Sequence, residues 1–534
     1  MKRYAAIAWI AAGLLILSMV GCQPSEQEAS SEDSATESVA ESTVDVESTP
    51  ESEDTGAEDT TTTPSADGTT APAGTGSSST KKPGSTKAPS KATTKDSGSK
   101  TTVVTTKKAT TTKFNPTYPA APNGNFKYQT STHDKSGDMK FLVPVSENFT
   151  TATPKDGGKL VNGVYNALDF GATPNDLSDD SDALNQAFNY AGTNAPLYIP
   201  AGLYIINRPL YIASNVQVVG DFTAPGCASP TVFLAYYGHG DEDAEPLITM
   251  GDSSSIRGIQ IYYPKQDKKS PVEYPPTIKS TDPDTTVDTV FIVNPWEALD
   301  FKAEAGRHFI RNVYSQPLKL GLSIDNCLDV GRLRNIQFRA YWSATAAEYQ
   351  RENTVGIDIG RSDWQYVDTV YMENMKSAWY FSATTSNVLL NDCTTAACYQ
   401  SVLVEGSRTG AGLIFSDCRL DGQFRVSYTN AGTITLKDCV LTANKYSAPL
   451  LNIHGLGTFI MRNCFADGSK SGDKSQPVLR LNTDQAIVSG NTFVGSGVHI
   501  LIDTEVKGAT LVGNVVPGGT LNLEDNGPVD YPIA

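Results

Sequence analysis

The chain has 534 residues and a formal net charge of −17 at pH 7, because 59 Asp and Glu outnumber 42 Lys and Arg. Such an acidic balance excludes the broad basic surface by which proteins hold nucleic acid, so we expect no nucleic-acid partner. Hydrophobic side chains make up 39% of the residues. That is enough for a folded domain, but they are spread unevenly along the chain.

The first 22 residues have the pattern of an export signal. Two basic residues precede an apolar run, residues 4–20, and Gly21-Cys22 follows. The segment from Met19 to Cys22 resembles a bacterial lipobox with Met in place of the more usual Leu, which implies that Cys22 carries lipid after cleavage. An uncleaved signal anchor is the alternative. Both interpretations place the protein at the extracellular face of a bacterial cell membrane.

Residues 23–113 contain hardly any large apolar side chains, so they predict a disordered stalk rich in Ser, Thr, Glu and Lys. Residues 23–67 carry fourteen Asp or Glu and no Lys or Arg, whereas residues 68–113 carry nine Lys and one Asp. The stalk is expected to be a solvated spacer. A second interpretation is that its Lys-rich half binds an anionic cell wall.

Residues 114–534 form one domain by composition, and its length is typical of a solenoid that grows along one axis. A short helix is predicted near its start, with Ser178 as the N-cap and Asp179-Asp180 at the positive end of the helix dipole. Its apolar face runs to Gly192 and comprises Ala183, Leu184, Ala187, Phe188 and Ala191. Residues 196–221 then predict strands, and no second convincing amphipathic helix follows.

The later part of the chain repeats a β-strand unit. Each unit starts with alternating β-branched residues, reaches an Asp, Asn or Gly corner, and turns. The residues at one point of successive units, at steps of 25, 21, 25, 27 and 23 residues, are Cys393, Cys418, Cys439, Cys464, Asn491 and Asn514. Stacked units would lie about 4.8 Å apart and pair every strand with its neighbours. The repeat predicts an all-β, single-stranded parallel β-helix with a short N-terminal capping helix.

Three short motifs near the start of the domain carry a family resemblance. They are Asp169-Phe170-Gly171-Ala172, then Asp179-Asp180 with Ala183 and Ala187, then Ile199-Pro200-Ala201-Gly202 with Tyr204. The stretch resembles the N-terminal motif of the pectate lyase superfamily, which includes rhamnogalacturonase and family 28 glycoside hydrolase relatives. The resemblance implies a right-handed parallel β-helix that acts on a polysaccharide.

The chain has eight cysteines, and four of them fall on the repeat. Buried Cys behaves as a small hydrophobe, and identical residues stack inside a solenoid, so we expect an inward column of free thiols. Cys393 with Cys398 is the pair that could form a disulfide, and the spacing leaves this open.

A carboxylate, one residue, a glycine and an arginine occur together three times: Glu304 to Arg307, Asp329 to Arg332, and Asp358 to Arg361. The steps of 25 and 29 residues suggest one turn each, so the carboxylates and the arginines could form columns. In one interpretation each carboxylate pairs with an arginine and stabilises a corner. In the other, the arginines face a groove and bind a glycan.

Carboxylates and aromatic rings gather in the same region, as a sugar-cleaving site requires. The candidate catalytic residues are Asp358, Asp363, Glu348 and Asp329. The candidate substrate-binding residues are Arg307, His308, Arg332, Arg361, Tyr341, Trp342 and Trp364. These residues predict a glycoside hydrolase at the cell surface with a polysaccharide as its partner and without a cofactor.

Two other functions stay open. One is a lyase of uronic-acid polymers, in which a basic side chain such as His308 removes a proton and calcium is a cofactor. The other is a non-catalytic glycan-binding or adhesion lipoprotein. Gly238-His239-Gly240 looks like a family 28 motif but lacks that family's other motifs, so we interpret it as a turn.

Overall fold

The computed structural model describes residues 160–192, 195–495 and 497–527. They form a parallel β-solenoid of about 13 turns. The predicted signal and stalk, residues 1–113, lie outside the described residues, as does the start of the predicted domain. The expected fold class is therefore confirmed for the part of the domain that the structure describes.

Successive turns stack three parallel sheets, which we number in chain order. Strands confined to sheet 1 are β1 (Tyr165–Asn166), β2 (Leu197–Tyr198), β5 (Gln217–Val219), β18 (Asn387–Asn391), β21 (Gly412–Ser416), β24 (Thr433–Lys437) and β31 (Gly508–Val512). Strands confined to sheet 2 are β3 (Gly202–Ile206), β6 (Thr231–Ala235), β19 (Thr394–Ala396), β22 (Arg419–Asp421), β25 (Val440–Thr442), β27 (Phe465–Asp467) and β29 (Thr492–Val494).

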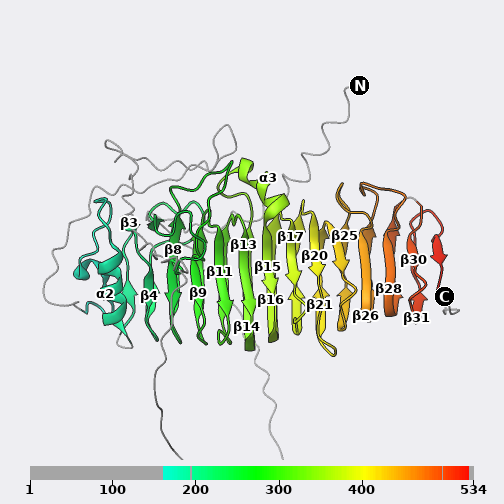
Figure 1. The fold of residues 1–534 in the computed structure, drawn as a ribbon, viewed down its shortest axis with the longest axis horizontal. Coiled ribbons are helices and arrows are strands. Elements are labelled where there is room, and N and C mark those ends of the chain that lie inside the picture. Colours follow the sequence, from blue (N-terminus) through cyan, green and yellow to red (C-terminus); the bar gives the residue numbers. More distant parts are fainter. Residues whose placement is uncertain (1–159, 193–194, 496, 528–534) are drawn as a thin grey trace, which may run out of the picture. The chain divides into compact units, whose positions relative to one another are not determined.

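Sheet 3 carries the surface that becomes important below. Its own strands are β4 (Leu210–Ile212), β7 (Ile248–Met250), β9 (Ile278–Ser280), β11 (Glu297–Lys302), β13 (Leu320–Asp325), β15 (Val355–Ile359), β17 (Ser377–Phe381), β20 (Gln400–Val404), β23 (Gln423–Val426), β30 (Ile500–Ile502) and β32 (Leu523–Asp525). Figure 1 shows these strands succeeding one another from β4, beside α2, to β30.

Longer strands join the sheets around the corners. Those that bend from sheet 1 into sheet 2 are β8 (Ser255–Tyr262), β10 (Thr286–Ile292), β12 (Phe309–Ser315), β14 (Cys327–Phe338) and β16 (Ser362–Glu373). Those that bend from sheet 3 into sheet 1 are β26 (Leu451–Arg462) and β28 (Leu479–Ser489).

From β8 onward, the corner between sheets 1 and 2 is made by one left-handed residue in each turn. The residues with positive φ at this position are Gly258, Thr289, Asn312, Asn335, Thr369, Asp392, Asp417, Asp438, Asn463, Gly490 and Gly513. Asn, Asp and Gly tolerate the left-handed region best, which explains the Asp, Asn or Gly corner in the sequence repeat. Asn335 Nδ2 also donates to Asn312 Oδ1 at 2.9 Å, so corner amides bond from one turn to the next.

Replacing one corner residue tests this account of the bend. Asp417 has φ 55° and an exposed side chain, so Asp417→Val should lower the free energy of unfolding by about 1–3 kcal/mol through backbone strain alone. Asp417→Gly removes the same side chain without the strain and should stay within about 0.5 kcal/mol of the parent. Urea unfolding measures both, and equal losses for Val and Gly would refute the strain.

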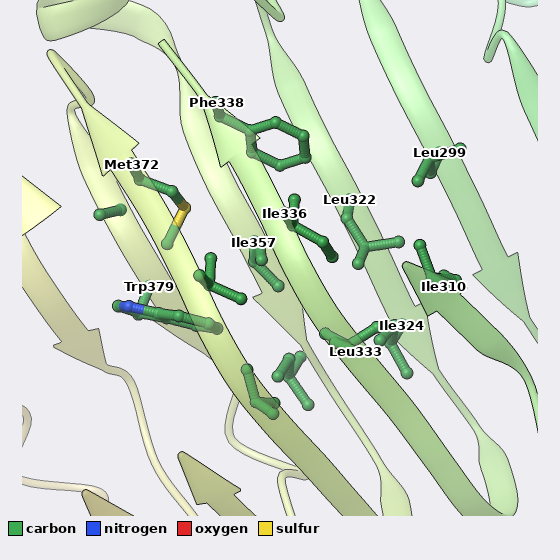
Figure 2. Close-up of a cluster of buried hydrophobic side chains, with 14 of the residues drawn as sticks. Leu299, Ile310, Leu322, Ile324, Leu333, Ile336, Phe338, Ile357, Met372 and Trp379 are labelled. Atoms are coloured by element: carbon green, nitrogen blue, oxygen red, sulfur yellow. The ribbon is translucent and has the colours of Figure 1, made fainter. Parts of the chain in front are cut away.

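The solenoid interior holds the apolar core and the predicted thiol column. Cys393, Cys418, Cys439 and Cys464 are each at most 2% exposed, and all four are free thiols. The column is therefore confirmed. Cys398 is also buried and free, so the structure contains no bond between it and Cys393. The interior near β13 to β17 is filled by large side chains, among them Phe338, Met372 and Trp379 (Figure 2).

The predicted N-terminal helix is α2 (Ser181–Ala191), which packs on β2 and β4 and is preceded by the 3-10 helix η1 (Ala167–Phe170). Its N-cap is Asp180 and not Ser178. The Asp180 carboxylate accepts the N–H groups of Thr173 and Ile205 at 2.7 and 3.0 Å, which ties this segment to β3. Burial raises the pKa of Asp180 to about 7. The carboxyl is thus a structural group, as the sequence indicated.

A second helix, α3 (Ala344–Asn353), was not predicted. It occupies the insertion between β14 and β15, and Ser343 caps it by accepting the N–H groups of Thr345 and Ala346. Gln350 Nε2 donates to the Pro317 carbonyl at 2.7 Å, which attaches the helix to the turn before β13. The helix was missed because its buried face is small and partly polar, so its sequence lacks an apolar stripe.

Candidate functional site

The three repeated motifs do not stack in register. Arg332 pairs with Phe309 across β12 and β14, whereas Arg307 lies two residues before Phe309 and Arg361 precedes β16. Asp358 lies in β15 of sheet 3, while Asp329 lies in β14. The expected columns of carboxylates and arginines are therefore wrong. The register is fixed by strand pairing and not by the motifs, because turns of different length separate the motifs from the strands.

Arg307 supports the structural interpretation of its motif. Its guanidinium lies 2.6 Å from Asp284 Oδ2 and 2.8 Å from Asp329 Oδ2, so it bridges two turns. The hydrogen bond from Arg307 lowers the pKa of Asp329 below its ordinary value. These contacts favour the interpretation in which Asp329 and Arg307 form an ion pair that stabilises a corner.

Asp358 instead belongs to a row of polar residues on the outer face of sheet 3. The residues that share its register position on neighbouring strands are Lys279 (β9), Asp300 (β11), Ser323 (β13) and Tyr380 (β17). Successive side chains of a strand point to opposite faces. Because Leu299 and Ile357 lie in the core (Figure 2), the adjacent Asp300 and Asp358 face outward.

Two lysines neutralise Asp300. Lys279 Nζ lies 3.4 Å from Asp300 Oδ2, and Lys302 Nζ lies 2.9 Å from Asp300 Oδ1. Asp300 is 3% exposed, so its charge needs these partners. Burial alone would lower the pKa of Lys302, but the hydrogen bond with Asp300 and the fields of Glu297 and Asp358 raise it. Lys302 is therefore held as a cation within the electrostatic range of Asp358.

Asp358 has no such partner. Among the described residues, no Lys, Arg or His nitrogen forms an ion pair with its carboxylate. Burial raises the pKa of Asp358 to about 6, against the attraction of Lys302 and helped by the repulsion of Asp325. A carboxyl with this pKa, at the edge of an ion-paired cluster, can give and take a proton near neutral pH.

Asp325 is the second carboxylate of the cluster. It is exposed at the end of β13, beside Lys302 in register. Its Oδ1 atom accepts the N–H of Arg361 at 2.9 Å. A Cβ on Gly360 would come within 2.2 Å of the same oxygen, so the glycine leaves the space that Asp325 occupies. We call Asp300, Lys302, Asp325 and Asp358, with Lys279 and Tyr380, the sheet 3 cluster.

Two of the predicted substrate-binding residues are buried, which argues against direct contact with a substrate. His308 is 0% exposed, its Nδ1 atom lies 2.7 Å from the Ala305 carbonyl, and burial lowers its pKa. Trp342 is 8% exposed. Neither side chain can contact a polysaccharide. Tyr341 is half-buried against the core, and its hydroxyl donates to Gln337 Oε1 at 2.8 Å.

The other predicted residues lie on different surfaces. Glu348 is exposed on α3, and Asp363 is exposed at the start of β16. Trp364 and Arg332 are exposed on the outer face of sheet 1. Arg361 joins the sheet 3 cluster only through its backbone N–H. The structure therefore brings Asp358, but none of the other predicted catalytic residues, into the sheet 3 cluster.

Sequence reasoning missed Asp300, Asp325, Lys279, Lys302 and Tyr380. A signal for one of them exists, because Leu299-Asp300-Phe301 and Ile357-Asp358-Ile359 each place an aspartate between two inward apolar residues. That pattern predicts an outward carboxylate on a strand. The register that aligns the two strands could not be read from the sequence, because α3 and its turns separate them.

None of the helices in the described residues combines the length and apolar character needed to cross a membrane. No three His, Cys, Asp or Glu side chains of the described residues gather closely enough to hold a metal ion. Gly238 and Gly240 have φ of 74° and 75° in the loop between β6 and β7, which fits their interpretation as a turn.

The family comparison supports the resemblance stated from the sequence. Residues 164–238 match the family model described as rhamnogalacturonase A/epimerase, pectate lyase-like. The resemblance is confirmed, and the chain carries a pectate lyase-like β-helix. No protein sequence with a curated description matches the chain.

Solved structures with similar folds include three carbohydrate-active proteins. The A-module of a mannuronan C-5 epimerase from Azotobacter vinelandii matches with 15% identity and a TM-score of 0.44 over 69% of this chain and 97% of its own. An exopolygalacturonase from Thermotoga maritima matches with 14% identity and a TM-score of 0.38 over 70% and 93%. A DFA-IIIase from Arthrobacter chlorophenolicus matches with 10% identity and a TM-score of 0.42 over 69% and 99%. Likeness at this level supports no inference about activity.

Proposed function

We propose that this pectate lyase-like β-helix protein hydrolyses a polysaccharide on the outer face of sheet 3. Asp358 acts as the general acid and Asp325 as the general base. The observation that carries the proposal is the unpaired Asp358, whose pKa is raised to about 6 beside a second, exposed carboxylate. Glycosidic hydrolysis requires such a pair in two protonation states.

The strand geometry supports an inverting reaction. Asp325 and Asp358 lie on adjacent strands and are offset by two residues, so their Cα atoms are about 8 Å apart at ordinary strand spacing and rise. Both side chains point outward from the same sheet, so we expect a carboxyl separation of the same order, and inverting enzymes separate their carboxyl groups by about 6.5–9.5 Å to admit a water molecule. In this reaction Asp358 protonates the glycosidic oxygen as its bond to the anomeric carbon breaks. Asp325 takes a proton from the water that attacks that carbon.

The lysines and the neighbouring strands complete the site. Lys302 and Lys279 hold Asp300, and ammonium groups of this kind can also donate to hydroxyl or carboxylate groups of a sugar. Beyond Tyr380, the same register position carries Leu403, Arg425, Asn452 and Arg480 on successive turns. A polymer lying along the solenoid axis would meet these side chains in order.

A lyase is less well supported by the same residues. In the form stated from the sequence, a basic side chain takes the proton, and that side chain must be unprotonated and must reach the substrate. Lys302 has a raised pKa and is held as a cation, and His308 is buried. The hydrolytic reaction therefore accounts better for the protonation states of the cluster.

The pH dependence of the reaction tests the role of Asp358. Since the acid must be protonated, kcat/KM should be retained below about pH 6, the folded-state pKa, and should fall about tenfold per pH unit well above it. Release of reducing ends, followed between pH 4 and 9, measures this fall in kcat/KM. A rate that stays level through pH 8 would exclude Asp358 as the acid.

We also propose that lipid on Cys22 anchors the protein outside a bacterial membrane and that residues 23–113 act as a spacer. The support is the lipobox-like sequence and the scarcity of large apolar side chains in the stalk. Radiolabelled palmitate should be incorporated by the full chain in a bacterial host. Labelling that persists in Cys22→Ala would contradict the assignment.

A further inference from the structure

The outer face of sheet 1 carries a concave surface. A hollow of about 390 Å³ is lined by side chains from β12, β14, β16 and β18, including Phe309, Arg332, Tyr366 and Leu389. These four residues share one register position on successive turns. They therefore form a line along the solenoid axis that spans three strand spacings, about 14 Å. We call this surface the sheet 1 hollow.

Two aromatic rings form a platform at the edge of this hollow, since Tyr366 lines it and Trp364 lies two residues away on the same strand. Trp364 and Tyr366 alternate on β16, are 43% and 44% exposed, and have ring centroids 6.4 Å apart with planes inclined by 15°. Exposed, nearly parallel rings leave one face of each free for a partner. The apolar face of a pyranose ring fits such a platform, and hydroxyl groups at its rim can meet the neighbouring Asn391 and Asp368.

The arginines around the hollow differ in their partners. Arg307 is held by Asp284 and Asp329, Arg311 by Asp288 at 2.9 Å, and Arg334 by Asp368 at 3.4 Å. Within the part of the chain that the structure describes, the side chain of Arg332 makes neither an ion pair nor a hydrogen bond. Arg332 lies between Phe309 and Tyr366 in the line of the hollow. A guanidinium without an ion-pair or hydrogen-bond partner, beside an aromatic platform, can pair with a sugar that bears one carboxylate.

We propose that the sheet 1 hollow binds an acidic polysaccharide through a uronic-acid residue, whose carboxylate pairs with Arg332 while sugar rings stack on Trp364 and Tyr366. The hollow contains no counterpart of the unpaired Asp358, because its carboxylate Asp368 is paired with Arg334. It therefore binds and does not cleave. A second binding surface would keep the polymer on the protein between cleavage events, but its binding requires no catalysis on sheet 3.

Tryptophan fluorescence reads out this surface through Trp364, the most exposed tryptophan of the described residues. Trp364 is exposed, whereas Trp296, Trp342 and Trp379 are at most 9% exposed. The full chain with Asp358→Asn is titrated with an oligogalacturonate and, separately, with a neutral cello-oligosaccharide of equal length. The same titration is run with Trp364→Phe, which keeps an aromatic ring but removes the signal, and with Arg332→Ala, which removes the charge. Arg462→Ala is the matched control, since Arg462 is exposed on the same sheet at β26, away from the hollow.

The expected result is a saturable emission change with oligogalacturonate that disappears in Trp364→Phe. Arg332→Ala should weaken this binding about tenfold or more, because one charge-assisted contact is lost. Arg462→Ala should leave the binding unchanged. The neutral oligosaccharide should bind at least about tenfold more weakly. Arg332→Lys, which keeps the charge, should recover part of the affinity and shows that the loss is not one of folding.

An emission change that Trp364→Phe leaves in place, or no change with either sugar, overturns the proposal. Equal affinity for both sugars with no effect of Arg332→Ala overturns the assignment of an acidic ligand. If the protein binds the sugar at this hollow but cleaves no polysaccharide, the proposed binding surface stands and the proposed hydrolase function is rejected. The two failures are thus distinguishable.

Discussion

Replacing Asp358 by Asn should lower polysaccharide cleavage by about 10²- to 10⁴-fold, the contribution of a general acid. The amide keeps the shape of the carboxyl group but cannot donate the proton that the leaving oxygen needs. The assay is the release of reducing ends at the optimal pH. Asp392→Asn is the control, because Asp392 is an exposed corner residue with φ 51°, where Asn is well tolerated.

The stability of the same variant separates catalysis from folding. The folded-state pKa of Asp358, about 6, lies above its ordinary value of 3.8. The folded protein therefore binds more protons than the unfolded chain between these values, and ionisation of Asp358 costs stability as pH rises through this window. Asn removes that cost, so the free energy of unfolding at pH 7 should not fall. A clear loss of stability would assign Asp358 to the scaffold.

Asp363 provides a further comparison within the same region. The sequence placed it among the catalytic candidates, but its exposed side chain lies at the start of β16 and not on sheet 3. Asp363→Ala should therefore keep most of the activity that Asp358→Asn loses. Loss of activity in Asp363→Ala alone would move the catalytic site toward sheet 1.

Replacing Trp379 by Ala should have the largest effect on stability, a loss of about 3–5 kcal/mol in the free energy of unfolding. Trp379 is 0% exposed on the inner face of β17 and stacks on Phe381, with ring centroids 6.3 Å apart and planes 8° apart. Figure 2 shows it in the interior near Met372 and Ile357. The truncation leaves a cavity that the rigid turns above and below cannot close.

Trp379→Phe tests the reason for this loss, since it keeps a ring in the core and should cost much less than Ala. Urea unfolding followed by circular dichroism measures both variants. Similar losses for Phe and Ala would show that the indole shape, and not the filled volume, stabilises these turns. A loss below about 1 kcal/mol for Ala would contradict close packing at this position.

The parts of the fold that repeat were readable from the sequence, because repetition makes local chemistry visible. Asp417 and Asp438 mark left-handed corners, and Cys418 and Cys439 follow each of them into the core. The same side chain at the same step in each turn has one simple structural cause. The thiol column and the corner could therefore be predicted before the strand bounds were known.

The candidate site was harder to predict because it lies where the repeat is irregular. The motif at Asp358 looks like those at Glu304 and Asp329, yet the inserted α3 and turns of unequal length place it on a different sheet. Local sequence similarity says nothing about such offsets. Asp325 and Asp300 were missed for the same reason, since only the pairing of β11, β13 and β15 brings them beside Asp358.

The same irregularity divides the predicted binding residues between two surfaces. Arg332 lines the hollow of sheet 1 and Trp364 lies beside it on β16, while Asp358 lies on sheet 3. A single groove containing all of them was the simplest expectation from their closeness in sequence. A solenoid turn carries residues only a few positions apart around a corner, so closeness in sequence does not imply a shared face.

One measurement tests hydrolysis on sheet 3 most directly. The full chain and its Asp358→Asn variant are incubated with neutral and acidic polysaccharides, with and without calcium, and both reducing ends and ultraviolet-absorbing unsaturated ends are followed. The account predicts reducing ends without unsaturated ends from at least one polymer, and their loss in the variant. Unsaturated ends would contradict it in favour of a lyase, and binding without either product would contradict it in favour of an adhesion protein.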